Sequence, residues 1–175
     1  MTDLRFPIGD FAFDGEMTPE RRQIFIQEIE ALPDLIRQAV SGLSTTQIDM
    51  PYRPAGWTIR QVIHHLPDSH MNSYIRMKLA LTEENPTIRP YFEDRWGELV
   101  DGRDGPIEMS LALLDALHER WVLMLQGLSD DDLARTFVHP EMGKTLSIDT
   151  NIALYAWHGN HHLAHITSLR GRKGW

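Results

Sequence analysis

Cysteine is absent from all 175 positions of this chain. The absence excludes disulfide bonds, thiolate metal sites and a cysteine nucleophile. Any metal ion must therefore be held by histidine, aspartate, glutamate or backbone oxygen. Any thiol chemistry must use a thiol that arrives on a second molecule.

The sequence also lacks long apolar runs. No stretch approaches the roughly 20 apolar residues that a membrane-spanning helix requires. The opening residues, "MTDLRFPIGDFAFDGEMT" (1–18), carry acids and prolines where a signal peptide would have an apolar segment. We therefore expect a cytoplasmic protein with no membrane partner.

Positive charge is scarce as well. With 17 lysines and arginines against 25 acids, the net charge is −8 and the pI is near 5.5. A protein that binds the phosphate backbone of nucleic acids needs a basic surface. The charge balance therefore argues against a nucleic-acid partner.

What is present is the composition of an ordinary globular protein, with 42% hydrophobic and 24% charged residues. A chain of this length predicts one domain, residues 1–175, in which residues 1–17 form an N-terminal arm. Apolar residues at helical spacing dominate the rest of the chain. They predict long helices over about 18–42, 58–81, 108–126 and 147–171.

The connections between these helices complete the predicted fold. Residues 83–106 form a long connection with a short helical piece around Trp96, and residues 136–148 predict two short extended pieces around a Met-Gly turn. The sequence therefore predicts an all-α four-helix bundle, with a long crossover between helices 2 and 3 and a short extended hairpin before the last helix. Pro33 lies inside the first predicted helix and should kink it.

A cluster of histidines in the last predicted helix, "WHGNHHLAHI" (157–166), points to metal binding. At about 100° per residue, all of them fall within an arc of about 100° that borders the apolar face. Two pairs, His158/His162 and His161/His165, have the i, i+4 spacing with which one helix presents two imidazoles to one cation. Spacing alone leaves both pairs open, and a solvated helix face is the alternative to a metal site.

A third ligand has to come from another helix, because catalytic metal sites usually have three protein ligands. The segment "RQVIHHLPDSHMNSYIR" (60–76) offers His65. Its side chain shares a polar stripe with Ser69, Asn72 and Arg76 beside the apolar face, as the wall of a pocket inside a bundle would.

The remaining histidines have simpler interpretations. His64 points further out and is expected at the surface. His70 and His118 lie in the middle of apolar stripes, so we interpret both as hydrogen-bonded core residues. His139 precedes Pro140 in a turn and has no supporting neighbours in the sequence.

Two long segments closely resemble the YfiT-like branch of the DinB-like superfamily: "PYRPAGWTIRQVIHHLPDSHMNSYIRMKLALTEENPTIRPY" (51–91) and "LYAWHGNHHLAHI" (154–166). The resemblance extends over nearly the whole chain, including "FPIGDF" and "SLALLDALHERW". Members of this branch are described as metal-dependent hydrolases, and they include the bacillithiol S-transferases. The resemblance implies a four-helix bundle in which three histidines hold one divalent ion.

Carried over by motif, the resemblance implies that His65, His158 and His162 are the metal ligands. His165 then takes a place where wider relatives often have glutamine. His161 is left at the surface or behind the ligands.

The chain departs from the family pattern at Pro67, two residues after His65, where a helix former is expected. Proline removes one intrahelical hydrogen bond and clashes with the preceding turn. We therefore expect a kink that re-aims His65 or Asp68.

Three neutral imidazoles leave the full 2+ charge of the ion available at its open positions. The resemblance then allows S-transfer, in which a low-molecular-weight thiol attacks an electrophilic substrate. It also allows hydrolysis of an amide or ester, which usually needs a carboxylate base. The absence of cysteine fits S-transfer, and the segment "HHLPDSH" (64–70) offers only Asp68 as a carboxylate base, so we prefer S-transfer. The candidate catalytic residues are Asp68, Asn72 and Arg76. A metal-binding stress protein without enzymatic activity is a further alternative.

The expected cofactor is one divalent metal ion, zinc or nickel foremost, with iron or manganese also compatible with three histidines. Relatives imply a homodimer. The aromatic tail "RFPIGDFAF" (5–13) would then pack across the neighbouring subunit or along its own bundle.

Overall fold

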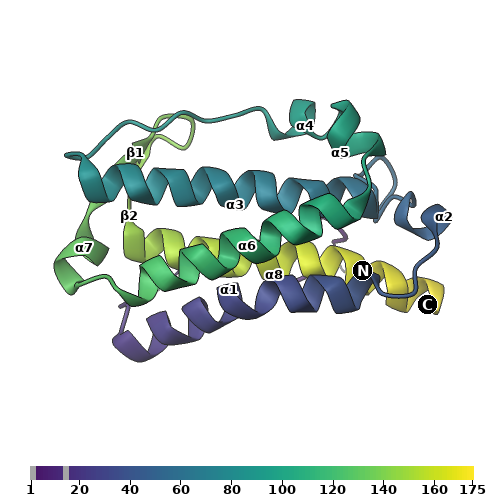
Figure 1. Ribbon diagram of the computed structural model, residues 1–175, viewed down its shortest axis with the longest axis horizontal. Coiled ribbons are helices and arrows are strands. Elements are labelled where there is room, and N and C mark those ends of the chain that lie inside the picture. The colour runs from purple at the N-terminus through teal and green to yellow at the C-terminus, as the bar shows by residue number, and fades with distance from the viewer. Residues whose placement is uncertain (1–2, 14–15) are drawn as a thin grey trace.

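The computed structural model describes residues 3–13 and 16–175 (Figure 1). Its long helices are α1 (Pro19–Val40), α3 (Ile59–Thr82), α6 (Ile107–Gln126) and α8 (Ile148–Lys173). Helices α1 and α3 each pack against both α6 and α8. This arrangement is the four-helix bundle that the sequence predicts. No helix in the described part of the chain is long and apolar enough to cross a membrane.

Short elements make up the connections. They are α2 (Thr45–Ile48), α4 (Glu93–Trp96), α5 (Val100–Asp104), α7 (Asp130–Ala134), β1 (Thr136–His139) and β2 (Lys144–Ser147). Strands β1 and β2 pair antiparallel, with Thr136 opposite Ser147 and His139 opposite Lys144. The predicted hairpin before the last helix is therefore confirmed.

The crossover between α3 and α6 runs back along α3 and is fastened to the hairpin (Figure 1). The amide of Ile88 donates to the carbonyl of Val138 at 3.0 Å, and the amide of Val138 donates to the carbonyl of Pro86 at 2.9 Å. These bonds hold the crossover and the hairpin together along one side of the bundle.

Local capping explains where the long helices begin. Thr18 caps α1 ahead of Pro19, Thr58 forms a capping box with Gln61 at the start of α3, and the Ser147 hydroxyl caps α8. Both α1 and α3 run unbroken through their internal prolines.

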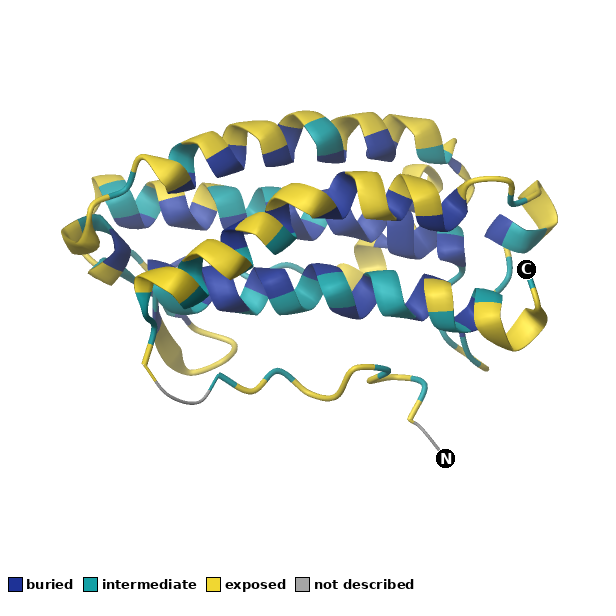
Figure 2. Cartoon of the chain, turned by 90° about the horizontal axis from the view of Figure 1, so that it is seen from below, coloured by how far each residue is buried: buried dark blue, intermediate teal, exposed yellow. Residues whose placement is uncertain are grey.

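A layer of histidines separates two apolar clusters along the bundle. Buried residues lie on the inner face of the long helices (Figure 2). The cluster at the hairpin end contains Met77, Trp121 and Phe137, and the cluster at the α2 end contains Leu66, Leu114 and Ile166. His70 lies between Leu66 and Met77 on α3, and His118 lies between Leu114 and Trp121 on α6. Both histidines are at most 1% exposed, as predicted for core residues.

The N-terminal arm lies along its own bundle over the described residues 3–13 (Figure 2). The ring of Phe11 is 5.9 Å from that of Trp157 on α8. The carbonyl of Arg5 lies 3.0 Å from Nε2 of His165. The arm therefore packs along its own bundle in this chain, while the predicted homodimer stays a prediction.

Gly159 sets the close approach of α1 and α8. A Cβ atom at this position would lie 2.5 Å from Cδ2 of Leu32, which is 1% exposed and cannot easily move aside. We expect Gly159→Ala to lower the melting temperature, because overpacking of about 1–3 kcal/mol outweighs a helix-propensity gain of about 1 kcal/mol.

Gly171 provides the matched control on the same helix, because a Cβ there meets nothing within 4 Å. Gly171→Ala should gain the higher helix propensity of alanine without a steric clash, and it should raise the melting temperature by about 2–4 °C. Thermal unfolding followed by circular dichroism measures both. Equal changes in melting temperature for the two variants would show that Gly159 and Leu32 are not tightly packed.

Candidate metal centre

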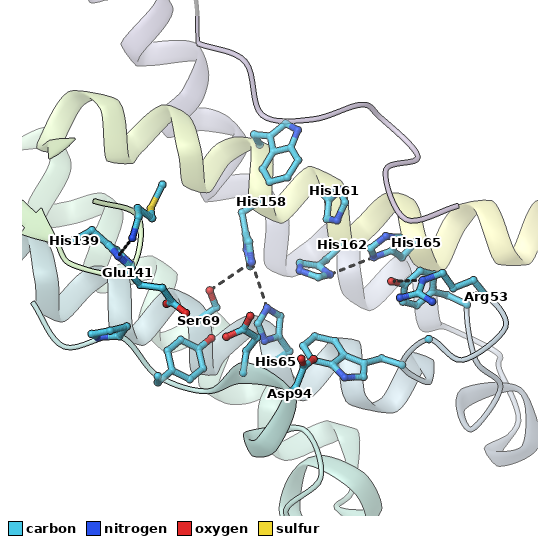
Figure 3. A pocket seen from close by; sticks show the side chains of 18 of the residues that line it. Arg53, His65, Ser69, Asp94, His139, Glu141, His158, His161, His162 and His165 are labelled. Atoms are coloured by element: carbon cyan, nitrogen blue, oxygen red, sulfur yellow. Dashed lines mark hydrogen bonds between the residues drawn. The ribbon is translucent and has the colours of Figure 1, made fainter. Parts of the chain in front are cut away.

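His65 from α3 and two histidines from α8 converge at the middle of the bundle (Figure 3). One ring nitrogen from each of His65, His158 and His162 lies within 4.8 Å of the others. Nε2 of His65 is 3.3 Å from Nε2 of His158. Two nitrogen ligands about 2.05 Å from one tetrahedral ion lie about 3.3 Å apart. The donor set and its spacing therefore fit a divalent metal ion, and they bring together the three ligands that the family motif implies.

The ring environments keep these histidines neutral. Burial lowers the pKa of His65 to about 4. Burial, together with the neighbouring imidazoles, also lowers the pKa of His158 and of His162 well below its usual range. Metal ligation requires an unprotonated ring nitrogen, so the site is ready for an ion at neutral pH.

A cavity of about 510 Å³ opens beside the three histidines. Its volume is in the range of ordinary small-molecule sites. The other walls come from the 52–57 loop, the crossover and the hairpin, and they include Trp57, Tyr91, Asp94, His139 and Glu141. An ion bound by the histidines would therefore face a space large enough for a substrate.

Of the three candidate catalytic residues, Arg76 is the one that the structure places in this cavity. Its side chain is 8% exposed, and its Nη2 donates to the carbonyl of Arg89 at 3.3 Å. Its buried Nε has no hydrogen-bond partner among the described residues. A guanidinium with a free buried donor is suited to an anionic group of a ligand.

Asp68 and Asn72 are not among the residues that line the cavity. The Asn72 amide donates to the backbone carbonyl of Asp68 at 2.8 Å, within α3. Burial, and then the negative charge of Asp101, raises the pKa of the Asp68 carboxyl to about 6.

Two histidines differ from their sequence interpretation. His64 is buried rather than at the surface, because its ring lies 2.7 Å from Oγ of Ser110 and 3.0 Å from the carbonyl of Gly105. His139 is also buried, on β1, where it lines the cavity. The partners of His64 lie more than 40 residues further along the chain, and Nδ1 of His139 accepts from the amide of Met142 at 3.4 Å in the hairpin turn, so helical spacing could predict neither environment.

The other two histidines of α8 lie behind or beside the ligands. His161 stacks on Trp157 with ring centroids 4.7 Å apart, and its Nδ1 is buried without a partner among the described residues. His165 points its Nδ1 at Nδ1 of His162, 3.3 Å away. Both are buried, so His161 is not a surface residue.

The buried neutral histidines make the metal-free protein sensitive to acid. Burial lowers the pKa of His65, His118 and His165 to about 4, below the usual value of 6.5. The unfolded chain therefore binds more protons than the folded chain below about pH 6.5, and stability should fall as pH decreases from there toward 4. Each such histidine contributes a slope of about 1.4 kcal/mol per pH unit.

Burial also raises the pKa of the carboxyls of Asp68 and Glu28, and these two groups act in the opposite direction, against a larger number of histidines. Urea unfolding of metal-free protein at pH 7.5, 6.5 and 5.5 measures the net slope. A free energy of unfolding that is constant or rises toward pH 5.5 would contradict the assignment of these rings as buried and neutral.

Comparison with known proteins agrees with this geometry. The family model described as the DinB superfamily matches residues 28–166. A Bacillus cereus strain B4264 protein named "putative metal-dependent hydrolase" is 55% identical over 175 residues, covering 100% of both chains. A protein of the same name from Oceanobacillus iheyensis is 58% identical over 171 residues, covering 98% of both.

The same fold occurs in a solved structure, YfiT from Bacillus subtilis, described as "a probable metal-dependent hydrolase with an unusual four-helix bundle topology". It aligns with a TM-score of 0.96 and 47% sequence identity over 98% of each chain. The family model matches most of the chain, and the relatives match over all or nearly all of their length, so the family can be assigned. The chain belongs to the DinB superfamily and has the four-helix-bundle fold of YfiT.

Proposed function

We propose that this protein is a divalent-metal-dependent enzyme whose ion is held by His65, His158 and His162. The observation that carries the proposal is the convergence of three neutral imidazoles beside a cavity. The names of its full-length relatives, which describe metal-dependent hydrolases, support it. The ion is zinc or nickel foremost, with iron or manganese compatible with the same ligands.

Within that class, we propose S-transfer from a low-molecular-weight thiol to an electrophilic substrate. When bound, the ion would lower the pKa of a thiol or a water, because three neutral ligands leave its charge uncompensated. The thiol loses its proton to solvent, its sulfur bonds to the electrophilic carbon, and the leaving group departs from that carbon with the bonding electron pair. The absence of cysteine is compatible with this reaction, because its nucleophile belongs to the cosubstrate, although hydrolysis by water needs no cysteine either.

Arg76 is the residue of this chain best suited to bind the thiol cosubstrate. Arg76 lines the cavity that also contains the metal-site histidines, and its buried Nε has no hydrogen-bond partner among the described residues. Low-molecular-weight thiols usually carry carboxylates, and a guanidinium binds a carboxylate with charge-assisted hydrogen bonds. The arginine would thus orient the thiol while the histidines hold the ion.

Hydrolysis of an amide or ester is the second candidate. Two carboxylates, Asp94 and Glu141, line the same cavity, and hydrolysis usually uses a carboxylate as general base. A protein that only binds metal is the third. The homodimer and the cytoplasmic location expected from the sequence stay predictions.

The test of this function begins with His162→Ala, which removes one ligand and should abolish both stoichiometric metal binding and thiol transfer to monochlorobimane. His64→Ala is the matched control, because His64 is equally buried on α3 but lies outside the cluster. Elemental analysis and bimane fluorescence provide the two readouts.

Removing the metal from the wild-type protein should abolish transfer, and adding it back should restore it. Metal-free protein that transfers thiol at the full rate would rule out the mechanism. Inactivity with every thiol, together with metal-dependent cleavage of an ester or amide, would assign the protein to the hydrolases.

Arg76→Met separates thiol binding from metal binding. The variant should keep its metal, because the side chain of Arg76 donates a hydrogen bond to the carbonyl of Arg89 and none to His65, His158 or His162. Loss of a charge-assisted hydrogen bond of about 1.5–3 kcal/mol should raise the KM for the thiol roughly 10- to 100-fold, with a smaller effect on kcat. An unchanged KM would show that the anionic group binds elsewhere.

A further inference from the structure

Three histidines that do not belong to the proposed ligand set connect the α8 ligands to the backbone. They are His70, His118 and His165, each at most 3% exposed. Each lies within hydrogen-bonding distance of another imidazole. A neutral imidazole has one N–H donor and one lone pair. In a row of hydrogen-bonded rings, the group at one end therefore decides which nitrogen of every ring carries the proton.

The first chain starts at a carbonyl that a proline sets free. In an α-helix the carbonyl of Ile29 would accept from the amide of residue 33, but that residue is Pro33, which has no N–H. Nδ1 of His118 lies 2.6 Å from this carbonyl. Because a carbonyl only accepts, the proton of His118 resides on Nδ1.

The proton positions of the next two rings follow from this. Nε2 of His118 carries a lone pair and lies 2.9 Å from Nδ1 of His70, which must therefore donate. Nε2 of His70 then carries a lone pair and lies 3.1 Å from Nδ1 of His158, which must donate in turn. Nε2 of His158 is left with its lone pair, and it is the atom that lies 3.3 Å from Nε2 of His65.

A second chain leads to the other α8 ligand. The carbonyl of Arg5, in the N-terminal arm, lies 3.0 Å from Nε2 of His165, so the proton of His165 resides on Nε2. Its Nδ1 lone pair is 3.3 Å from Nδ1 of His162, which must donate (Figure 3). Nε2 of His162 is then the atom with a free lone pair.

We propose that His118, His70 and His165 are positioning residues that hold His158 and His162 in the tautomer whose Nε2 lone pair faces the metal ion. The proposal rests on the metal site proposed above. Partners behind metal-binding histidines typically change metal affinity by 10- to 100-fold. Here these partners are themselves imidazoles, and each chain ends on a backbone carbonyl.

A different use of the same rings is a second metal site. His161, His162 and His165 also offer nitrogens within 4.8 Å of one another. The second chain instead assigns the contact between His162 and His165 to a hydrogen bond. The proposed hydrogen-bond chains therefore require one metal ion per protein molecule. A metal titration that ends at two equivalents per protein molecule would overturn them.

The direct test reads the tautomers in the metal-free wild-type protein. Long-range ¹H–¹⁵N correlation spectra of ¹⁵N-histidine-labelled protein distinguish Nδ1–H from Nε2–H. We expect Nδ1–H for His70, His118, His158 and His162, and Nε2–H for His165. A predominant Nε2–H form at His158 or His162 would overturn the proposal.

Variants of His118 test the effect on metal binding. His118→Phe keeps a ring but removes both nitrogens, and it should weaken metal affinity 10- to 100-fold in a competition titration. His118→Gln offers an N–H and a C=O at similar spacing and should restore the affinity to within a few-fold. His64→Phe, which removes a buried histidine outside both chains, should leave the affinity unchanged.

Each further outcome has a defined meaning. A folded His118→Phe protein with wild-type affinity would overturn the positioning role. If this variant does not fold, the wild-type tautomers decide the proposal. If the wild-type protein binds no ion, the proposed function fails, whereas the tautomer pattern still decides whether the chains exist.

Discussion

The burial of a layer of imidazoles across the middle of the bundle is the constraint on which this structure depends. A polar ring removed from water is costly unless its nitrogens find partners. The apolar clusters on either side of the layer exclude water and hold the four long helices at fixed spacing. Each buried ring must then meet another ring, a backbone carbonyl or an ion, and the close contact of α1 and α8 at Gly159 lies at the same level.

The uncharged character of these partners matters for the chemistry. A carboxylate behind a metal-bound histidine would add negative charge to the site, whereas an imidazole or a carbonyl adds none. The rings behind His158 and His162 are neutral donors and acceptors. A divalent ion held here would keep most of its charge for a substrate in the cavity, which Arg76 also lines.

The sequence predicted the parts of this design that local spacing encodes. Apolar periodicity and capping residues such as Thr58 and Ser147 located the long helices. The family motif named His158 and His162, and the structure brings both within 4.8 Å of His65, while their role as ligands stays a prediction. Local spacing could not place His64, whose partners Ser110 and Gly105 follow more than 40 residues later. For the same reason it missed the cavity walls, which the crossover and the hairpin bring in from the side.

Pro33 shows that the effect of a proline on its own helix does not reveal what the freed carbonyl does in the folded bundle. Read along the chain, the proline is a defect, because it removes one hydrogen bond from α1. In the bundle, the carbonyl that it frees accepts from His118, which replaces the lost donor with one from α6. The defect therefore costs little, and it fixes the direction of a chain of hydrogen bonds that ends at His158. A helix former at this position would supply its own N–H and compete with His118 for that carbonyl.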